Sequence, residues 1–190
     1  MKAGIFYFSG TGNTKYVAEK LNNELINKNI STDIFPIEKF IKENLFFDFE
    51  MYDILFFGYC VHAFESPSIF KDFLHLLPKN KNPIKTVIFK TAGDPLANGG
   101  STKFIHNALK NKNFEITYEK LFVMPSNVFV KFSDQMVVSL YNKADELCNL
   151  MIDDIIHNRI NIQHNSFITD IFSTIFSSME SFGVRRVGKK

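Results

Sequence analysis

Cysteine is scarce in this chain. Its only two cysteines, Cys60 and Cys148, lie far apart, and no C-x-x-C pair occurs. Their number and spacing exclude a disulfide framework and a zinc or iron–sulfur site. So few cysteines are typical of a reducing compartment, and we therefore expect a cytoplasmic protein.

Long hydrophobic runs and a strong net charge are also missing. No uninterrupted apolar run reaches membrane-spanning length, and the N-terminus lacks the charged lead and apolar core of a signal peptide. We therefore expect no transmembrane segment. The net charge is only +2 and the lysines are scattered, so no nucleic-acid partner is indicated. A length of 190 residues suits one α/β domain.

The chain opens with a polar glycine loop between two apolar segments. Residues 3–8 are apolar and aromatic, as expected of a buried strand. Residues 14–25 carry apolar side chains at helical spacing. The loop between them reads S-G-T-G-N-T and is a strand-to-helix turn.

A strand-to-helix turn of this kind can bind an anion. The first N–H groups of a helix have no internal partner, and together with the helix dipole they form a site for a phosphate. Gly10 and Gly12 allow a ligand to approach the backbone closely, while Ser9, Thr11 and Thr14 add hydroxyl donors. An ordinary glycine turn before a helix is the simpler alternative.

Two known phosphate-binding motifs are absent from this loop, and their absence limits the kinds of ligand that it could bind. A dinucleotide fingerprint needs a third glycine where this chain has Lys15, which disfavours an NAD site. No Gly-Lys-Ser/Thr triplet follows Gly10 at the spacing of a nucleotide-triphosphate loop, which disfavours ATP or GTP. The pattern that remains favours a single phosphomonoester held by neutral donors. It resembles the FMN phosphate loop of flavodoxins.

The rest of the chain alternates strands and helices. This alternation predicts an α/β fold with a doubly wound, five-stranded parallel sheet, right-handed crossovers and helices on both faces. The further strands are expected at residues 31–36, 53–59, 86–91 and 116–124, and the helices at 37–47 (a short helix or loop), 67–77, 101–110 and 134–157.

Ligands of such sheets bind at the carboxyl ends of the strands, so the loops after the third and fourth strands should suit a flavin. Aromatic and imidazole faces can stack on the planar ring, and small residues let backbone N–H groups reach its polar edge. We predict that the cofactor-binding residues are Ser9, Gly10, Thr11, Gly12, Asn13 and Thr14 from the first loop, Tyr59, Cys60, Val61, His62, Ala63 and Phe64 from the second, and Thr91, Ala92, Gly93 and Asp94 from the third.

Some of these residues also have plainer interpretations. Tyr59, His62 and Phe64 could simply cover the end of the sheet. His62 could act as a general acid or base, but no second catalytic group is paired with it in the sequence. Cys60 and Cys148 are typical packing cysteines. We name no catalytic residue and no metal ligand.

The three loops together carry a resemblance to a known family. Residues 1–160 resemble a flavodoxin-like FMN-binding domain, whose strand order would be 2-1-3-4-5. The combination FYFSGTGNTKYVAE, GYCVHAFESPSIFKDFL and KTAGDP most resembles flavodoxin-domain proteins that carry a C-terminal ferredoxin module. The resemblance implies FMN, an electron-transfer role and a redox partner protein, such as a ferredoxin or iron–sulfur module. The cysteines of such a module are absent from this chain.

Residues 161–190 form a second expected unit, a C-terminal amphipathic helix with a basic tail. An apolar stripe at helical period runs through residues 166–182, with only Asp170 and Glu180 charged. Its face could dock on its own domain, on a partner or missing module, or on a membrane surface.

Two functions compete. The first is an FMN-binding, one-electron carrier between redox partners, an electron-transfer flavoprotein rather than a self-contained oxidoreductase. The alternative is an FMN-dependent NAD(P)H reductase of a quinone or other small molecule. The sequence offers no clear arginine for a dinucleotide phosphate, because Arg159, Arg185 and Arg186 all lie late in the chain. A flavodoxin fold that has lost its cofactor and serves as a docking module is a third, weaker possibility.

Overall fold

The computed structural model describes residues 1–43, 47–62, 65–93, 101–125 and 132–162, and for residues 101 and 102 only the backbone. Strands and helices alternate along these residues. In chain order the elements are β1 (Lys2–Tyr7), α1 (Asn13–Asn27), β2 (Ser31–Pro36), α2 (Ile37–Glu43), a short 3-10 turn (Phe49–Met51), β3 (Ile54–Cys60), α3 (Ser68–Leu76), β4 (Ile84–Ala92), α4 (Ser101–Lys110), β5 (Phe114–Val123) and α5 (Asp134–Ile156).

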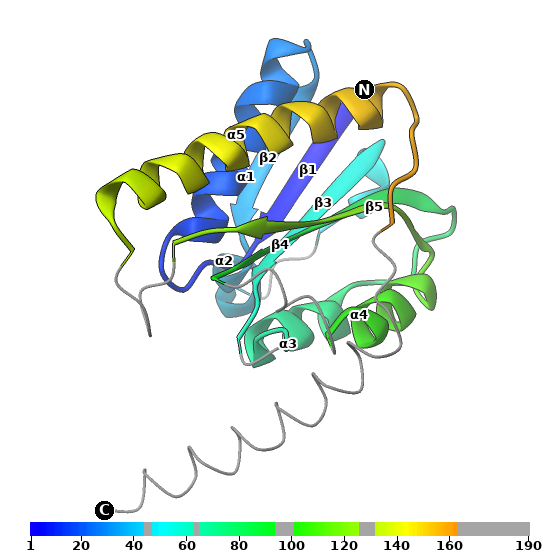
Figure 1. Cartoon of the computed structure of the whole chain (residues 1–190). Coiled ribbons are helices and arrows are strands. Elements are labelled where there is room, and N and C mark those ends of the chain that lie inside the picture. The colour runs from blue at the N-terminus through cyan, green and yellow to red at the C-terminus, as the bar shows by residue number, and fades with distance from the viewer. Residues whose placement is uncertain (44–46, 63–64, 94–100, 126–131, 163–190) are drawn as a thin grey trace, which may run out of the picture.

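The five strands form one parallel sheet in the order β2-β1-β3-β4-β5 (Figure 1). The expected fold class and strand order are therefore confirmed. The first six residues of β3 are fully buried, as its continuous apolar run predicts, whereas β2 at the edge is only partly covered. The order reverses beside β1, and this switch point is where open α/β sheets bind ligands.

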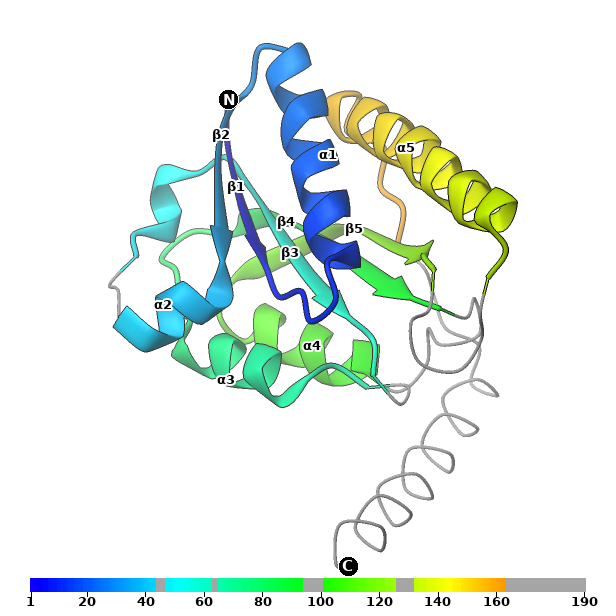
Figure 2. The same ribbon diagram turned by 90° about the vertical axis from the view of Figure 1, so that its left-hand side faces the viewer.

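Helices cover both faces of the sheet (Figure 2). α1 and α5 lie side by side on one face, where Lys20 of α1 pairs with Asp145 of α5 at 3.1 Å. On the other face α2, α3 and α4 enclose a core rich in phenylalanine. There the ring of Phe6 contacts the rings of Phe57 and Phe73, with centroids about 6.0 Å apart.

Beyond α5 the described chain returns to the sheet. The backbone N–H of Glu119 donates to the carbonyl of Asn161 at 2.8 Å, and Asn161 donates back to Thr117 at 3.1 Å. Residues 166–182, the expected amphipathic helix, lie outside the described residues. Within the part of the chain that the structure describes, no helix has the length and apolar character needed to cross a bilayer.

Candidate functional site

The carboxyl ends of β1, β3 and β4 bring the three predicted loops together. The hydroxyls of Thr14 and Thr91 form a buried hydrogen bond of 2.8 Å between the first helix and the end of β4. The N–H of Val61 donates to the carbonyl of Thr91 at 2.8 Å, and Phe8 donates to Gly58 at 2.9 Å. The loops therefore form one connected edge rather than three separate turns.

Two backbone N–H groups at the glycine loop donate to a single oxygen. The N–H groups of Gly12 and Lys15 both donate to the Oγ of Ser9, each at 3.1 Å. Gly12 has φ +97°, which a residue with a side chain rarely adopts, and a Cβ there would meet nothing within 4 Å. Converging N–H groups at an open helix N-terminus are the arrangement that binds an anion.

Two polar residues of the loop are directed into the protein. The amide nitrogen of Asn13 donates to the carbonyl of Pro125 at 2.8 Å, and its oxygen accepts a long bond of 3.4 Å from Tyr141. Thr14 is fully buried. These side chains fix the loop against the end of β5 and against α5. Thr11 and Gly10 are exposed and remain accessible to a ligand.

The end of β3 and the loop that follows it combine a buried ring with an exposed one. The Tyr59 ring is fully buried and lies 4.5 Å from the Phe70 ring, centroid to centroid. The exposed His62 imidazole lies beside the glycine loop, because a Cβ on Gly10 would come within 3.9 Å of its Nε2. Whether Tyr59 also contacts a flavin stays a prediction.

Cys60 and His62 form a close pair, with Sγ 3.2 Å from Nε2. The spacing is that of a nucleophile and its base. However, burial raises the pKa of the Cys60 thiol, although hydrogen bonds from the Gly10 backbone and the Thr14 hydroxyl oppose this effect. Activated thiols have depressed pKa values, so the raised pKa of Cys60 does not favour a nucleophilic role for this pair.

The loop after β4 provides small residues at the same edge. Thr91 and Ala92 are buried, Gly93 is exposed, and the carbonyl of Ala92 accepts from the N–H of Met124 at 2.8 Å. The predicted site residues Ala63, Phe64 and Asp94 lie outside the described residues.

Sequence reasoning missed several residues behind this edge. Ser66 is 4% exposed, and its Oγ has no partner among the described residues, although it lies in the loop after β3. Phe89 of β4 covers Gly58 so closely that a Cβ there would lie 2.0 Å from the ring. Lys90 and Glu119 form a buried ion pair, which the partly exposed His106 contacts. No sequence motif marks these contacts, because they join different elements.

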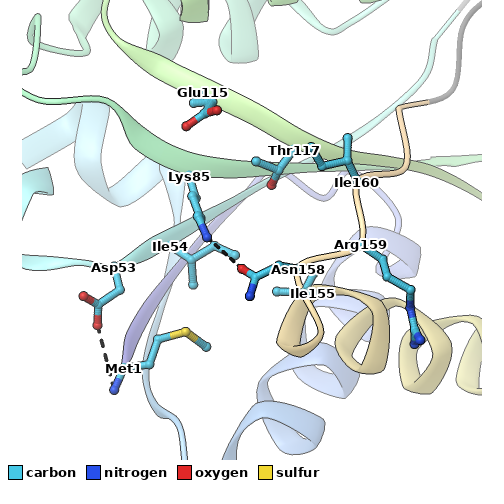
Figure 3. A pocket seen from close by; sticks show the side chains of 10 residues that line it. All are labelled: Met1, Asp53, Ile54, Lys85, Glu115, Thr117, Ile155, Asn158, Arg159 and Ile160. Carbon is cyan, nitrogen blue, oxygen red and sulfur yellow. Dashed lines mark hydrogen bonds and ion pairs between the residues drawn. The ribbon is translucent and has the colours of Figure 1, made fainter.

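The described residues contain a second hollow at the opposite edge of the sheet (Figure 3). It has a volume of about 400 Å³ and mixes acidic, basic and apolar side chains. Both of its basic side chains are already engaged: Lys85 donates to Asn158 at 2.8 Å, and Arg159 pairs with Asp153 and Asp154. No group of acidic, histidine or cysteine side chains in the described part could hold a metal ion. The hollow thus lacks the converging backbone N–H groups of the glycine loop.

The fold is that of a doubly wound α/β protein with a glycine loop at the switch point of its sheet. The flavodoxin domain family matches residues 4–120, more than half of the chain. This chain therefore belongs to the flavodoxin-domain family. A comparison with curated proteins found no significant match.

Solved structures share the fold at low sequence identity. A flavodoxin from the domain Archaea is 16% identical, with a TM-score of 0.54, covering 82% of this chain and 99% of that one. A Fusobacterium nucleatum flavodoxin bound to flavin mononucleotide is 14% identical, with a TM-score of 0.53 and coverage of 80% and 97%. The azoreductase AzrA is 9% identical, with a TM-score of 0.51 and coverage of 79% and 100%.

The residues present fit the cofactor of this family, which is FMN. Two N–H groups already converge on one oxygen, the neighbouring donors are hydroxyls, and a Cβ on Gly12 would meet none of the described atoms within 4 Å. The unpartnered Ser66 hydroxyl offers a further polar group behind the same loop cluster. Bound FMN supplies a ring that can accept and release electrons one or two at a time.

Proposed function

We propose that this protein is a one-electron carrier that uses FMN, held at the carboxyl edge of the sheet, to pass electrons between redox partners. The loop of Ser9 to Thr14 holds the FMN phosphate. The loops after β3 and β4 flank the flavin ring through the backbone and side chains of residues such as His62 and Gly93. Tyr59, Cys60, Val61, Thr91 and Ala92 complete this part of the site.

The observation that carries this proposal is the convergence of three loops on one edge of the sheet, whose described residues include no activated catalytic pair. The glycine loop supplies converging N–H donors for a phosphate. The Cys60–His62 pair there has a thiol whose pKa is raised by burial. A carrier needs no acid–base side chain, because the protein only binds the flavin and sets its potential.

The partner is proposed by its chemistry. An iron–sulfur protein such as a ferredoxin exchanges single electrons and therefore suits a carrier of this kind. We place the protein in the cytoplasm, with residues 1–160 as the FMN-binding domain and residues 161–190 as a helix with a basic tail.

The alternative function is an FMN-dependent reductase that oxidises NAD(P)H and reduces a quinone or another small molecule. The similarity to an azoreductase concerns the fold alone. A reductase needs a contact for the dinucleotide phosphate. Among the described residues, Arg159 is occupied by Asp153 and Asp154 at the opposite edge of the sheet. The one-electron carrier therefore has the better support.

An anaerobic reductive titration of the FMN-loaded protein separates the two functions. Dithionite is added in steps, and the visible spectrum is followed. A carrier takes up its two electrons in two separated one-electron steps and does not oxidise NADH or NADPH. A single two-electron step, together with turnover of NADH or NADPH, contradicts the carrier and supports the reductase.

A further inference from the structure

A buried ion pair begins one residue before Thr91, a predicted cofactor-binding residue at the end of β4. The ammonium of Lys90 in β4 pairs with the Oε1 of Glu119 in β5, and both side chains are fully buried. Lys90 precedes Thr91 in the chain, and its Cα is paired with that of Tyr59 in β3. The ion pair therefore joins β4, whose end supplies predicted cofactor-binding residues, to the edge strand β5.

His106 connects this pair to the solvent. Its Nε2 lies 2.6 Å from the Oε2 of Glu119, and its side chain is 29% exposed, whereas that of Glu119 is wholly buried. An ionised carboxylate can only accept hydrogen bonds, so Nε2 carries a proton and donates it. The second ring nitrogen, Nδ1, is then the position for a further proton.

The electrostatics of the cluster keep Glu119 ionised. Burial alone would raise the pKa of its carboxyl, but the hydrogen bond from His106 and the ammonium of Lys90 hold this pKa below its ordinary value. Lys90 and Glu119 therefore cancel in charge. The cluster is neutral when His106 is neutral, and it carries one positive charge when His106 is doubly protonated.

Few other charges face His106 among the described residues. From the sheet, the groups are Lys90 in β4 and Glu119 in β5. From α3, the neighbouring groups are Lys71 and His75, which lie against the ring of Phe104, two residues before His106 in α4. Lys71 is itself paired with Glu65 at 2.5 Å. Protonation of His106 thus adds one positive charge to the described part of this cluster.

An ion pair in the interior rarely stabilises a fold better than apolar side chains of similar volume. A buried charge does, however, act strongly on a neighbouring redox group, because the interior screens it weakly. We propose that Lys90, Glu119 and His106 form a charge relay in which a proton taken up by His106 favours the reduced form of the bound FMN. The inference rests on the proposed FMN site.

The electrons and the proton of the proposed step can each be accounted for. An external reductant supplies the electrons to FMN, and the solvent supplies one proton to Nδ1 of His106. The hydrogen bond from Nε2 to Glu119 is kept, and no covalent bond other than the new N–H is made in the relay. Because binding free energies are reciprocal, reduced FMN in turn favours the doubly protonated form of His106.

The test measures the midpoint potential of the bound FMN between about pH 5.5 and 8.5, where imidazoles titrate. The proteins compared are the wild type, His106→Gln and His106→Lys. His75→Gln is the matched control, because His75 lies on the neighbouring helix without a described carboxylate contact. FMN affinity is measured first for each protein, so that a failure of the FMN site is recognised separately.

The relay predicts a difference in pH dependence. At low pH and the same applied potential, the ratio of reduced to oxidised FMN should be about fivefold higher in the wild type than in His106→Gln. The reason is the one additional positive charge that His106 carries in the wild type. The two proteins should agree at high pH. His106→Lys should keep the low-pH behaviour throughout, and His75→Gln should follow the wild type.

The relay is wrong if wild type and His106→Gln bind FMN and share one pH dependence. Absence of FMN binding by the wild type would instead overturn the proposed function, and the relay with it. A second measurement needs no variant. By NMR, the His106 ring should take up its second proton at a higher pH in the reduced than in the oxidised protein, and an unchanged titration contradicts the relay.

Discussion

Thr14 and Thr91 are 77 positions apart, yet their hydroxyl groups share a buried hydrogen bond of 2.8 Å. The bond joins the first turn of α1, which follows the glycine loop, to the end of β4. Both side chains are almost completely buried. This contact fixes the distance between the glycine loop and the end of β4, the two places that the proposed site assigns to the FMN phosphate and to the flavin edge.

Removing one of these hydroxyls should weaken both the fold and the site. Thr14→Val or Thr91→Val leaves a buried hydroxyl without its partner, so we expect the free energy of unfolding to fall by about 1–3 kcal/mol. The double variant should lose less than the sum of the two. Urea unfolding of the four proteins without FMN measures the coupling, and strictly additive losses contradict it.

Two glycines of the site should respond differently to alanine. Gly58→Ala places a Cβ 2.0 Å from the Phe89 ring, and such overpacking should lower the free energy of unfolding by about 2–3 kcal/mol. Gly10→Ala meets only His62, at 3.9 Å, so the fold should change little while FMN affinity falls. Thermal unfolding and FMN titration of both variants check this contrast. Equal destabilisation by the two substitutions speaks against the close packing of Phe89 on Gly58.

The reactivity of the Cys60 thiol in the wild-type protein depends on its surroundings in the loop cluster. Because burial raises its pKa, less thiolate is present at neutral pH than in a free cysteine. Alkylation by iodoacetamide should therefore be slower than that of a free thiol at about pH 7.5 and should accelerate as the pH rises.

FMN should protect Cys60 further, since the thiol lies against Gly10 and His62. Mass spectrometry of the alkylated protein, with Cys60→Ser as the blank, gives the rate at this position. An equal rate with and without saturating FMN would place the cofactor elsewhere.

Glu119 should make stability depend on pH. Its pKa is depressed in the folded protein, so its contribution is present above the ordinary value of 4.5 and is lost as the pH falls through the depressed pKa. Glu119→Gln should cost about 3–5 kcal/mol at neutral pH and flatten the acid dependence. Glu115→Gln, an exposed position on the same strand, is the control. Parallel pH profiles for wild type and Glu119→Gln contradict the prediction.

The sequence was sufficient to predict the layout of the fold. Hydrophobic periodicity placed strand 31–36 and helix 101–110 within the bounds that the structure has, and the others within a few residues. The apolar run of β3 predicted a strand covered on both faces, and it is buried over six residues. Local sequence patterns are sufficient there because the spacing of apolar residues within a segment indicates which of its faces are buried.

The interior of the site could not be predicted in this way. The sequence analysis treated Thr14 as a hydroxyl donor of the phosphate loop, and nothing local shows that it bonds to Thr91. The Lys90–Glu119–His106 cluster joins β4, β5 and α4 through side chains alone. Such contacts depend on strand order and register, which only the assembled sheet defines.

The most direct test of the account compares FMN with riboflavin, which lacks the phosphate. We expect the wild type to bind FMN at least about 100-fold more tightly, because charge-assisted bonds to the glycine loop are available only to the phosphate. Ser9→Ala should weaken FMN by about tenfold and leave riboflavin unchanged, and Ser31→Ala, exposed at the far end of β2, should change neither. Equal affinity for the two flavins would contradict a phosphate site in this loop.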